Sequence, residues 1–367
     1  MLQGHGDDTY DHPGIRSNFS SNIFPHADLT GLKAHLKRKL DLIERYPEPE
    51  PRSLEKVIAR KHGISSDNVL VTNGATDAIY LIAQTAAKNH HTHFSVGPLP
   101  TFREYEDACR MFGLAQVNGC DGSKKAGRTI LWLCNPNNPT GELYPKAELE
   151  DYARRYGLVV IDQSYEDYTL EPVMTHQEAA ASRNIVQLHS LTKTYAVPGL
   201  RIGYVVAPQH IIARLRENVR PWAVNALAIE AGLWLMENDI CVLQDPKDPK
   251  DLKDPKNPKD LKDPKDPTFP QSHSGLRALL AETRRLREML NQIPGITAAE
   301  TQTNFFLVEM ASKSAAELKD HLAQKHHILI RDASNFRGLT PRHFRISTQH
   351  PDENTCLADA IREFMLL

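Results

Sequence analysis

The stretch Ser190-Leu-Thr-Lys193-Thr-Tyr-Ala-Val-Pro-Gly-Leu-Arg201-Ile-Gly203 decides how this sequence is interpreted. It follows the apolar run Ile185–Leu188, which predicts a buried strand. Lys193 lies among hydroxyl side chains, and a second cation, Arg201, follows it eight residues later. A lysine whose pKa is lowered by a neighbouring cation can act as a nucleophile that forms a Schiff base. The alternative is an exposed lysine in a surface loop, where most lysines lie.

Short apolar runs alternate with helical segments on both sides of this stretch. Expected strands cover residues 69–71, 92–96, 115–117, 130–133, 158–161, 185–188 and 202–206, and expected helices cover 30–42, 53–62, 76–87, 101–112, 146–156, 209–217 and 222–240. This alternation indicates a mostly parallel sheet that helices cover on both faces. Ligands of such sheets bind beyond the carboxyl ends of the strands. We therefore predict an α/β fold whose large domain has three αβα layers.

The chain is expected to have four parts. Residues 1–28 would form an N-terminal arm, residues 29–240 the large domain and residues 268–367 a smaller α+β domain. Residues 245–267 repeat an Asp-Pro-Lys triplet that carries seven Asp and seven Lys. Because proline disfavours helix and central strand there, we expect a solvated loop, with partner binding as the alternative. The small domain should contain helices at 274–292 and 352–366 and strands at 304–309, 328–330 and 344–346.

Composition argues against several classes of protein. The 44 Lys and Arg nearly balance the 46 Asp and Glu, so no overall field points to nucleic acid or to a membrane surface. No run of 18 apolar residues occurs, and the polar first twenty residues contain no signal-peptide core. The five cysteines are scattered without a Cys-x-x-Cys pair, which indicates reduced thiols in a cytoplasmic protein.

The segment around Lys193 resembles the cofactor-lysine segment of pyridoxal-phosphate enzymes of fold type I, the aspartate aminotransferase superfamily. Within that superfamily the chain is most similar to the threonine-phosphate decarboxylases, with the histidinol-phosphate aminotransferases as near relatives. Lys193-Thr-Tyr-Ala-Val-Pro-Gly, Arg220-Pro-Trp-Ala-Val-Asn225 and the Gly-His5-Gly start carry this similarity. It covers nearly the whole chain except the triplet repeat, and it implies pyridoxal 5'-phosphate as the cofactor.

Two other motif matches are weaker. Ser190-x-x-Lys193 also fits the serine–lysine motif of β-lactamases, but the Ser66-Asp-Asn box precedes it instead of following it, and no Lys-Thr-Gly occurs. The histidines of His90-His-Thr-His93 have no carboxylate or cysteine at ligand spacing, so no metal site is predicted.

The cofactor needs a lysine for its aldehyde, an acid for its pyridine nitrogen and donors for its phenolate oxygen. By resemblance Lys193 is the lysine. Asp162 ends an apolar run, where a buried carboxylate needs a cation such as the protonated pyridine nitrogen, although a helix N-cap is the alternative. Asp162-Gln-Ser-Tyr165 resembles the D-x-x-Y of the family, and Asn-Pro-Asn-Asn138-Pro-Thr-Gly resembles its turn. The resemblance implies that Tyr165 and Asn138 donate to the phenolate oxygen.

A glycine turn at the start of a helix predicts a phosphate site, because free N–H groups point at the anion there. Its expected members are Gly74, Ala75, Thr76, Ser190 and Arg201. The family often has an acidic residue at the position of Ala75, where backbone amides would make the contacts. The resemblance further implies that Phe102 stacks on the cofactor ring and that Tyr46 reaches the phosphate of a neighbouring subunit. The resemblance therefore also implies a homodimer in which the two subunits share their active sites.

The resemblance also assigns substrate contacts. Arg345 would bind the substrate carboxylate and Arg331 a substrate phosphate, with surface salt bridges as the alternative for both. Asn22 and His5 belong to the arm that would cover the site. The implied substrate is L-threonine O-3-phosphate, decarboxylated to aminopropanol phosphate for cobalamin biosynthesis. Two alternatives stay open: an aminotransferase of the histidinol-phosphate type that uses 2-oxoglutarate, and a non-catalytic binding protein on the same fold.

Overall fold

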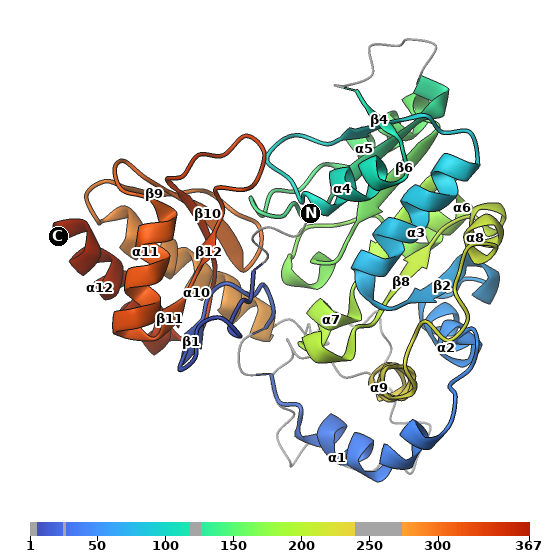
Figure 1. Cartoon of the computed structure of the whole chain (residues 1–367), viewed down its shortest axis with the longest axis horizontal. Coiled ribbons are helices and arrows are strands. Elements are labelled where there is room, and N and C mark those ends of the chain that lie inside the picture. The colour runs from blue at the N-terminus through green and yellow to red at the C-terminus, as the bar shows by residue number, and fades with distance from the viewer. Residues whose placement is uncertain (1–5, 25–26, 118–125, 239–273) are drawn as a thin grey trace, which may run out of the picture.

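A computed structural model describes residues 6–24, 27–117, 126–238 and 274–367, and it places the two larger of three β-sheets in two separate lobes (Figure 1). His5 and the triplet repeat at 245–267 lie outside the described residues. None of the described helices combines the length and apolar composition that a membrane crossing requires.

The large lobe is built on a seven-stranded sheet. Its strands are β2 (Val69–Thr72), β3 (His93–Val96), β4 (Ala115–Gln116), β5 (Thr129–Cys134), β6 (Leu158–Asp162), β7 (Ile185–His189) and β8 (Gly203–Val206). Their order is β2-β8-β7-β6-β5-β3-β4, and only β8 runs antiparallel to its neighbours. The prediction of an α/β fold with a mostly parallel sheet is confirmed.

Helices cover both faces of this sheet. They are α1 (Thr30–Arg38), α2 (Arg52–His62), α3 (Gly74–Lys88), α4 (Glu104–Met111), α5 (Lys146–Arg155), α6 (His176–Ala181), α8 (Gln209–Arg216) and α9 (Ala226–Glu237). Alternate residues of β5 enter two different cores, because neighbouring strand residues point to opposite faces. Leu131 and Leu133 pack into one core, and Ile130 and Trp132 pack into the other. Both faces are therefore apolar, which explains the uninterrupted apolar runs in the sequence.

Several predicted helix boundaries are wrong by a few residues. The helix expected at 53–62 begins at Arg52, with Pro51 at its N-cap position. The helix expected at 30–42 ends at Arg38 and continues as a separate 3-10 turn, Leu40–Glu44. The helix expected from residue 222 begins only at Ala226, where the Asn225 side chain accepts a hydrogen bond from the Ala228 N–H.

The small lobe carries an antiparallel sheet with the order β12-β13-β10-β9. These strands are β9 (Ile296–Ala298), β10 (Phe305–Met310), β12 (Arg331–Asp332) and β13 (His343–Ser347), and the helices are α10 (Ser274–Asn291), α11 (Ala315–His321) and α12 (Pro351–Leu366). A short arm strand, β1 (Ser17–Asn18), pairs with β11 (Ile328–Leu329) of this lobe. The arm is thus fixed to the small lobe at the boundary with the large one.

Candidate active site

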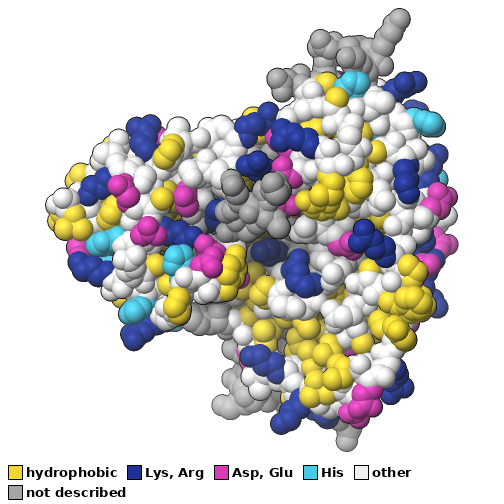
Figure 2. Space-filling view, viewed as in Figure 1, with side chains coloured by type: hydrophobic (Ala, Val, Ile, Leu, Met, Phe, Trp, Pro, Cys, Tyr) yellow, Lys and Arg dark blue, Asp and Glu magenta, His cyan; other side chains and the backbone are white. Residues whose placement is uncertain are grey.

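The carboxyl ends of the central strands open onto a cavity of about 300 Å³ between the lobes. Eleven of the predicted site residues line it: Asn22, Ala75, Thr76, Phe102, Asn138, Asp162, Tyr165, Ser190, Lys193, Arg201 and Arg345. Figure 2 shows Lys and Arg side chains in the hollow at this boundary. The structure therefore brings together residues that are more than 300 positions apart in the sequence.

Lys193 lies in the one-turn helix α7 (Leu191–Thr194), which begins directly after β7. The backbone of this turn is held on both sides, because the Lys193 N–H donates to the Ser190 carbonyl (3.0 Å) and the Tyr168 hydroxyl donates to the Lys193 carbonyl (2.8 Å). Burial first, and the positive charge of Arg345 second, lower the pKa of the Lys193 amine to about 8. The amine makes no hydrogen bond or ion pair with any described residue, so it is available as a nucleophile.

Asp162 is buried at the end of β6, and its carboxylate accepts three hydrogen bonds. Tyr105 donates its hydroxyl to Oδ2 (2.7 Å), and Ser164 donates its hydroxyl (2.5 Å) and its backbone N–H (3.0 Å) to Oδ1. Burial raises the pKa of Asp162, although these hydrogen bonds and the charge of Lys193 oppose the rise, and no described cation forms an ion pair with the carboxylate. A protonated ring nitrogen would supply the missing positive charge, so this carboxylate fits the cofactor.

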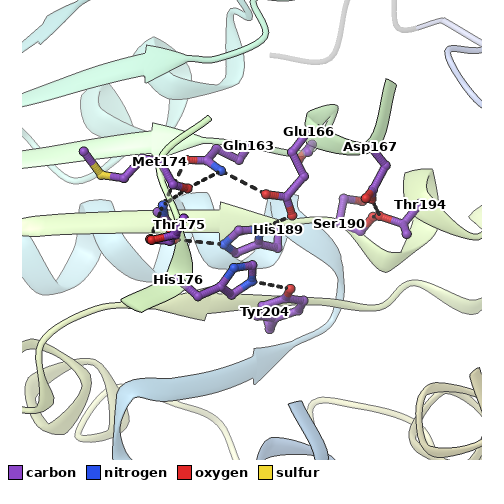
Figure 3. A network of polar contacts seen from close by, with 12 residues as sticks. Gln163, Glu166, Asp167, Met174, Thr175, His176, His189, Ser190, Thr194 and Tyr204 are labelled. Atoms are coloured by element: carbon purple, nitrogen blue, oxygen red, sulfur yellow. Dashed lines mark hydrogen bonds and ion pairs between the residues drawn. The ribbon is translucent and has the colours of Figure 1, made fainter. Parts of the chain in front are cut away.

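A buried polar network lies beside the segment that carries the lysine (Figure 3). Glu166 pairs with His189 (2.7 Å), whose ring stacks on that of His176 at a centroid distance of 4.2 Å. Burial lowers the pKa of His189 to about 3 and that of His176 to about 2, so both rings are neutral. Asp167 accepts a hydrogen bond from the Thr194 hydroxyl (2.6 Å) at the end of α7. The network thus fixes both ends of the segment that carries the lysine.

The turn after β5 places Asn138 in the cavity. Its backbone N–H donates to the Cys134 sulfur (3.4 Å), and its side-chain oxygen accepts a hydrogen bond from Arg345 (2.6 Å). No hydrogen bond joins the amide nitrogen of this side chain to a described residue, so it can donate to a ligand. Tyr165 lies across the cavity with its ring packed edge-on against Phe305 at a centroid distance of 4.8 Å.

The expected phosphate site forms where α3 meets Arg201. Gly74 has a φ of +83°, and a Cβ atom there would lie 2.8 Å from an Arg201 nitrogen. A Cβ atom on Gly203 would lie 2.9 Å from the backbone nitrogen of Ala75. Both positions therefore require glycine, and the guanidinium lies against the first turn of α3. Free N–H groups of a helix start beside an arginine suit a phosphate.

Arg331 and Arg345 face each other directly on the paired strands β12 and β13. Arg345 is buried and donates to Asn138 and to the Ser20 carbonyl (2.7 Å), while its Nε makes no hydrogen bond. Arg331 donates to the Asp332 carbonyl (2.6 Å) and to Asn335 (2.7 Å) and is not among the residues that line the cavity. Neither pairs with a described carboxylate, so the alternative of surface salt bridges is wrong. Two like charges that face each other destabilise the folded protein until an anion binds to both of them.

Other predicted residues lie around this centre. The Phe102 ring packs edge-on against Tyr105 at a centroid distance of 5.6 Å. The Asn22 amide is buried beside Tyr165 without a hydrogen bond of normal geometry. Tyr46 lies away from the cavity, 83% exposed, with its ring 5.4 Å from that of Trp222.

Sequence reasoning missed Tyr105 and Ser164, which hold Asp162. Ser164 stands two residues after the aspartate, a spacing at which side chains often bond back to the chain, so this signal was available. Tyr105 could not be told apart from an ordinary core aromatic, because its partner comes from a distant strand.

Comparison with known proteins identifies the family. A model of the class I and II aminotransferases matches residues 16–244 and 259–361. Threonine-phosphate decarboxylase of Salmonella typhimurium is 28% identical over 95% of this chain and 91% of its own. A histidinol-phosphate aminotransferase of Thermoanaerobacter sp. is 26% identical over 89% of this chain and 86% of its own.

Solved structures give the same result. The structure of L-threonine-O-3-phosphate decarboxylase from Porphyromonas gingivalis matches with a TM-score of 0.81 and 32% identity, over 96% of this chain and 100% of that one. Histidinol-phosphate aminotransferase from Sinorhizobium meliloti, solved in complex with pyridoxal-5'-phosphate, shares the fold with a TM-score of 0.73 and 18% identity, over 96% of this chain and 91% of that one. The family match and the curated relatives confirm the predicted cofactor, and this chain belongs to the pyridoxal-phosphate-dependent class I and II aminotransferase family.

Proposed function

We propose that the protein decarboxylates L-threonine O-3-phosphate to aminopropanol phosphate, a step of cobalamin biosynthesis. The opposed pair Arg331 and Arg345 carries this proposal, because the pair lacks a described carboxylate and the substrate offers both a carboxylate and a phosphate. The similarity to threonine-phosphate decarboxylases over nearly the whole chain supports it.

Each group around the cavity has a task in this reaction. When bound, pyridoxal phosphate withdraws electrons from the substrate α-carbon, so that one bond to that carbon can break. Asp162 would hold the proton of the ring nitrogen, and Asn138 and Tyr165 would donate to the phenolate oxygen. Arg345 would bind and orient the carboxylate. Lys193, whose pKa is about 8, can return a proton to the α-carbon after carbon dioxide leaves.

An aminotransferase of the histidinol-phosphate type is the second candidate, since such enzymes are 26% identical to this chain. It would use the same lysine to move a proton, and the two arginines could bind the two carboxylates of 2-oxoglutarate. A protein without catalysis is disfavoured, because a binding protein would not need an unpaired lysine amine beside a buried carboxylate.

We also propose a homodimer located in the cytoplasm. Leu40, Ile43, Tyr46 and Trp222 are exposed apolar residues of the large lobe, and a second copy would cover them. Figure 2 shows hydrophobic side chains gathered on this lobe. The described cysteines are all free thiols, as a reducing compartment favours.

Substrate comparison tests the reaction. The purified holo-protein is supplied with L-threonine O-3-phosphate without a keto acid, and carbon dioxide and aminopropanol phosphate are measured. In parallel it receives histidinol phosphate with 2-oxoglutarate, and glutamate is measured. We expect product only in the first reaction. Glutamate formation without release of carbon dioxide would show that the protein is the aminotransferase and not the decarboxylase. If neither reaction gives product, both proposed activities are wrong.

A further inference from the structure

The small lobe contains a histidine pair that the active site does not use. Helix α11 ends at His321 and continues into a single π-helical turn, Leu322–His326. A π-turn has a hydrogen-bond spacing of five residues, so it brings positions 321 and 326 to the same side of the helix. The two rings lie 5.3 Å apart between centroids. Single π-turns inside helices often mark functional sites.

One ring nitrogen of each imidazole lacks a hydrogen bond to the described residues. The Nε2 atoms of His321 and His326 are both buried, and neither makes a hydrogen bond. Buried polar atoms in folded proteins nearly always have such a partner, so two unsatisfied nitrogens next to each other need an explanation. The His326 side chain is 24% exposed, so the pair lies near the surface of the small lobe.

Helix α12 brings a carboxylate to the same place, since it packs beside α11 (Figure 1). Glu363 Oε2 lies 3.5 Å from the Nε2 of His326. One ligand atom from each of His321, His326 and Glu363 can be chosen so that all three lie within 4.8 Å of one another. In a tetrahedral zinc site with bonds of about 2.0–2.2 Å, ligand atoms lie roughly 3.3 Å apart. Modest rotations of these three side chains would therefore bring their ligand atoms to the separation that a zinc ion needs.

We propose that His321, His326 and Glu363 bind a zinc ion. Two imidazoles and a carboxylate are a ligand set that zinc prefers, and a water molecule from solvent would take the fourth position. The ion would join the π-turn to α12 and so connect two helices of the small lobe. Because it would bind the folded state, it would raise the stability of the protein without taking part in catalysis.

Lys325 carries the positive charge that most opposes a cation at this position. Its ammonium pairs with Oε1 of Glu363, which leaves Oε2 for the metal. The Lys325 side chain is 56% exposed and can turn into solvent, where water screens its charge. Lys313 is engaged elsewhere, since it donates to the Phe364 carbonyl (2.6 Å). The repulsion therefore weakens the site without blocking it.

Zinc titration of the full-length holo-protein tests the proposal. After treatment with a chelator, zinc chloride is titrated by calorimetry, and Tm is measured with and without zinc. We expect one site per chain that raises Tm. His321→Gln and His326→Gln should each weaken binding by at least about tenfold, the loss that even outer-shell changes cause in metal sites. Their Tm without zinc should stay near that of the wild type, because neither nitrogen makes a hydrogen bond.

Two further variants make the outcome decisive. Glu363→Gln should also weaken binding, and it leaves both histidines intact if a histidine variant fails to fold. His210→Gln alters an exposed histidine of α8 in the large lobe and should bind zinc like the wild type. The proposal is overturned if the wild type binds no zinc at 100-fold excess over protein, or if His321, His326 and Glu363 variants bind as tightly as the His210 variant.

Discussion

Replacing Arg345 by glutamine should change two independent properties of the active site. If this guanidinium makes two hydrogen bonds to the substrate carboxylate, each is worth about 1.5–3 kcal/mol, since one partner is charged. A loss of about 3 kcal/mol corresponds to a fall of roughly 100-fold in kcat/KM for decarboxylation. The second effect concerns Lys193, because the charge of Arg345 is the largest electrostatic contribution that lowers the pKa of its amine.

The sign of the second effect follows from that contribution. Without the Arg345 charge the pKa of Lys193 rises above about 8, so less of the amine is neutral at a given pH. Capture of pyridoxal phosphate by the apo-protein requires the neutral amine, and visible absorbance follows it. The midpoint of the capture rate against pH should therefore move upward in Arg345→Gln.

Arg342→Gln is the matched control, because Arg342 is an exposed arginine that pairs with Glu309 at the start of the same strand region (2.8 Å). It should leave both kcat/KM and the capture midpoint unchanged. The reasoning is refuted if Arg345→Gln keeps kcat/KM within threefold of the wild type, or if its capture midpoint stays in place or moves to lower pH.

Three further outcomes follow from particular contacts. Lys193→Ala should abolish turnover while its circular dichroism and Tm stay near those of the wild type, and normal turnover would contradict its assignment as the nucleophile. Gly203→Ala should lower the free energy of unfolding by about 1–3 kcal/mol in urea denaturation, since its Cβ would lie 2.7 Å from the His189 carbonyl; an unchanged midpoint would exclude this clash. Burial lowers the pKa of His62 to about 4, of His176 to about 2 and of His189 to about 3. Between pH 6.5 and these values the unfolded chain binds protons that the folded chain does not, so the free energy of unfolding should fall from pH 7 to pH 5, by about 2 kcal/mol per imidazole. A flat profile over this range in urea denaturation would show that these rings are charged in the folded protein.

The central sheet could be predicted from the sequence because its central strands are mostly apolar, and β5 and β6 each contain an uninterrupted apolar run. Asp162 and Lys193 each stand within a few residues of such a strand end, and parallel strand ends share one edge, so their meeting in one cavity could be expected. Their individual roles remain predictions. Helix α11 was overlooked, although Ser314 and Glu317 form a capping box at its start.

Other features could not have been read from local pattern. The pairing of Glu166 with His189 and the stacking on His176 join three separate elements. The π-turn after His321 contacts α12, and no residue type signals an extra residue in a helical turn.

Arg345 joins three parts of the chain that the reaction must coordinate. It stands on β13 of the small lobe, donates to Asn138 in the turn after β5 of the large lobe, and donates to the Ser20 carbonyl in the arm. Both of its outer nitrogens are therefore occupied by neutral acceptors. A substrate carboxylate can bind Nε or displace one of these acceptors, and a bond to a charged acceptor is stronger than a neutral one by about 1 kcal/mol. Displacing Asn138 would free its side-chain oxygen, while displacing Ser20 would release the arm from β13. A substrate carboxylate that displaces either acceptor therefore couples binding at this guanidinium to the position of the arm or of the turn that faces the cofactor, whereas one that binds Nε leaves both contacts in place.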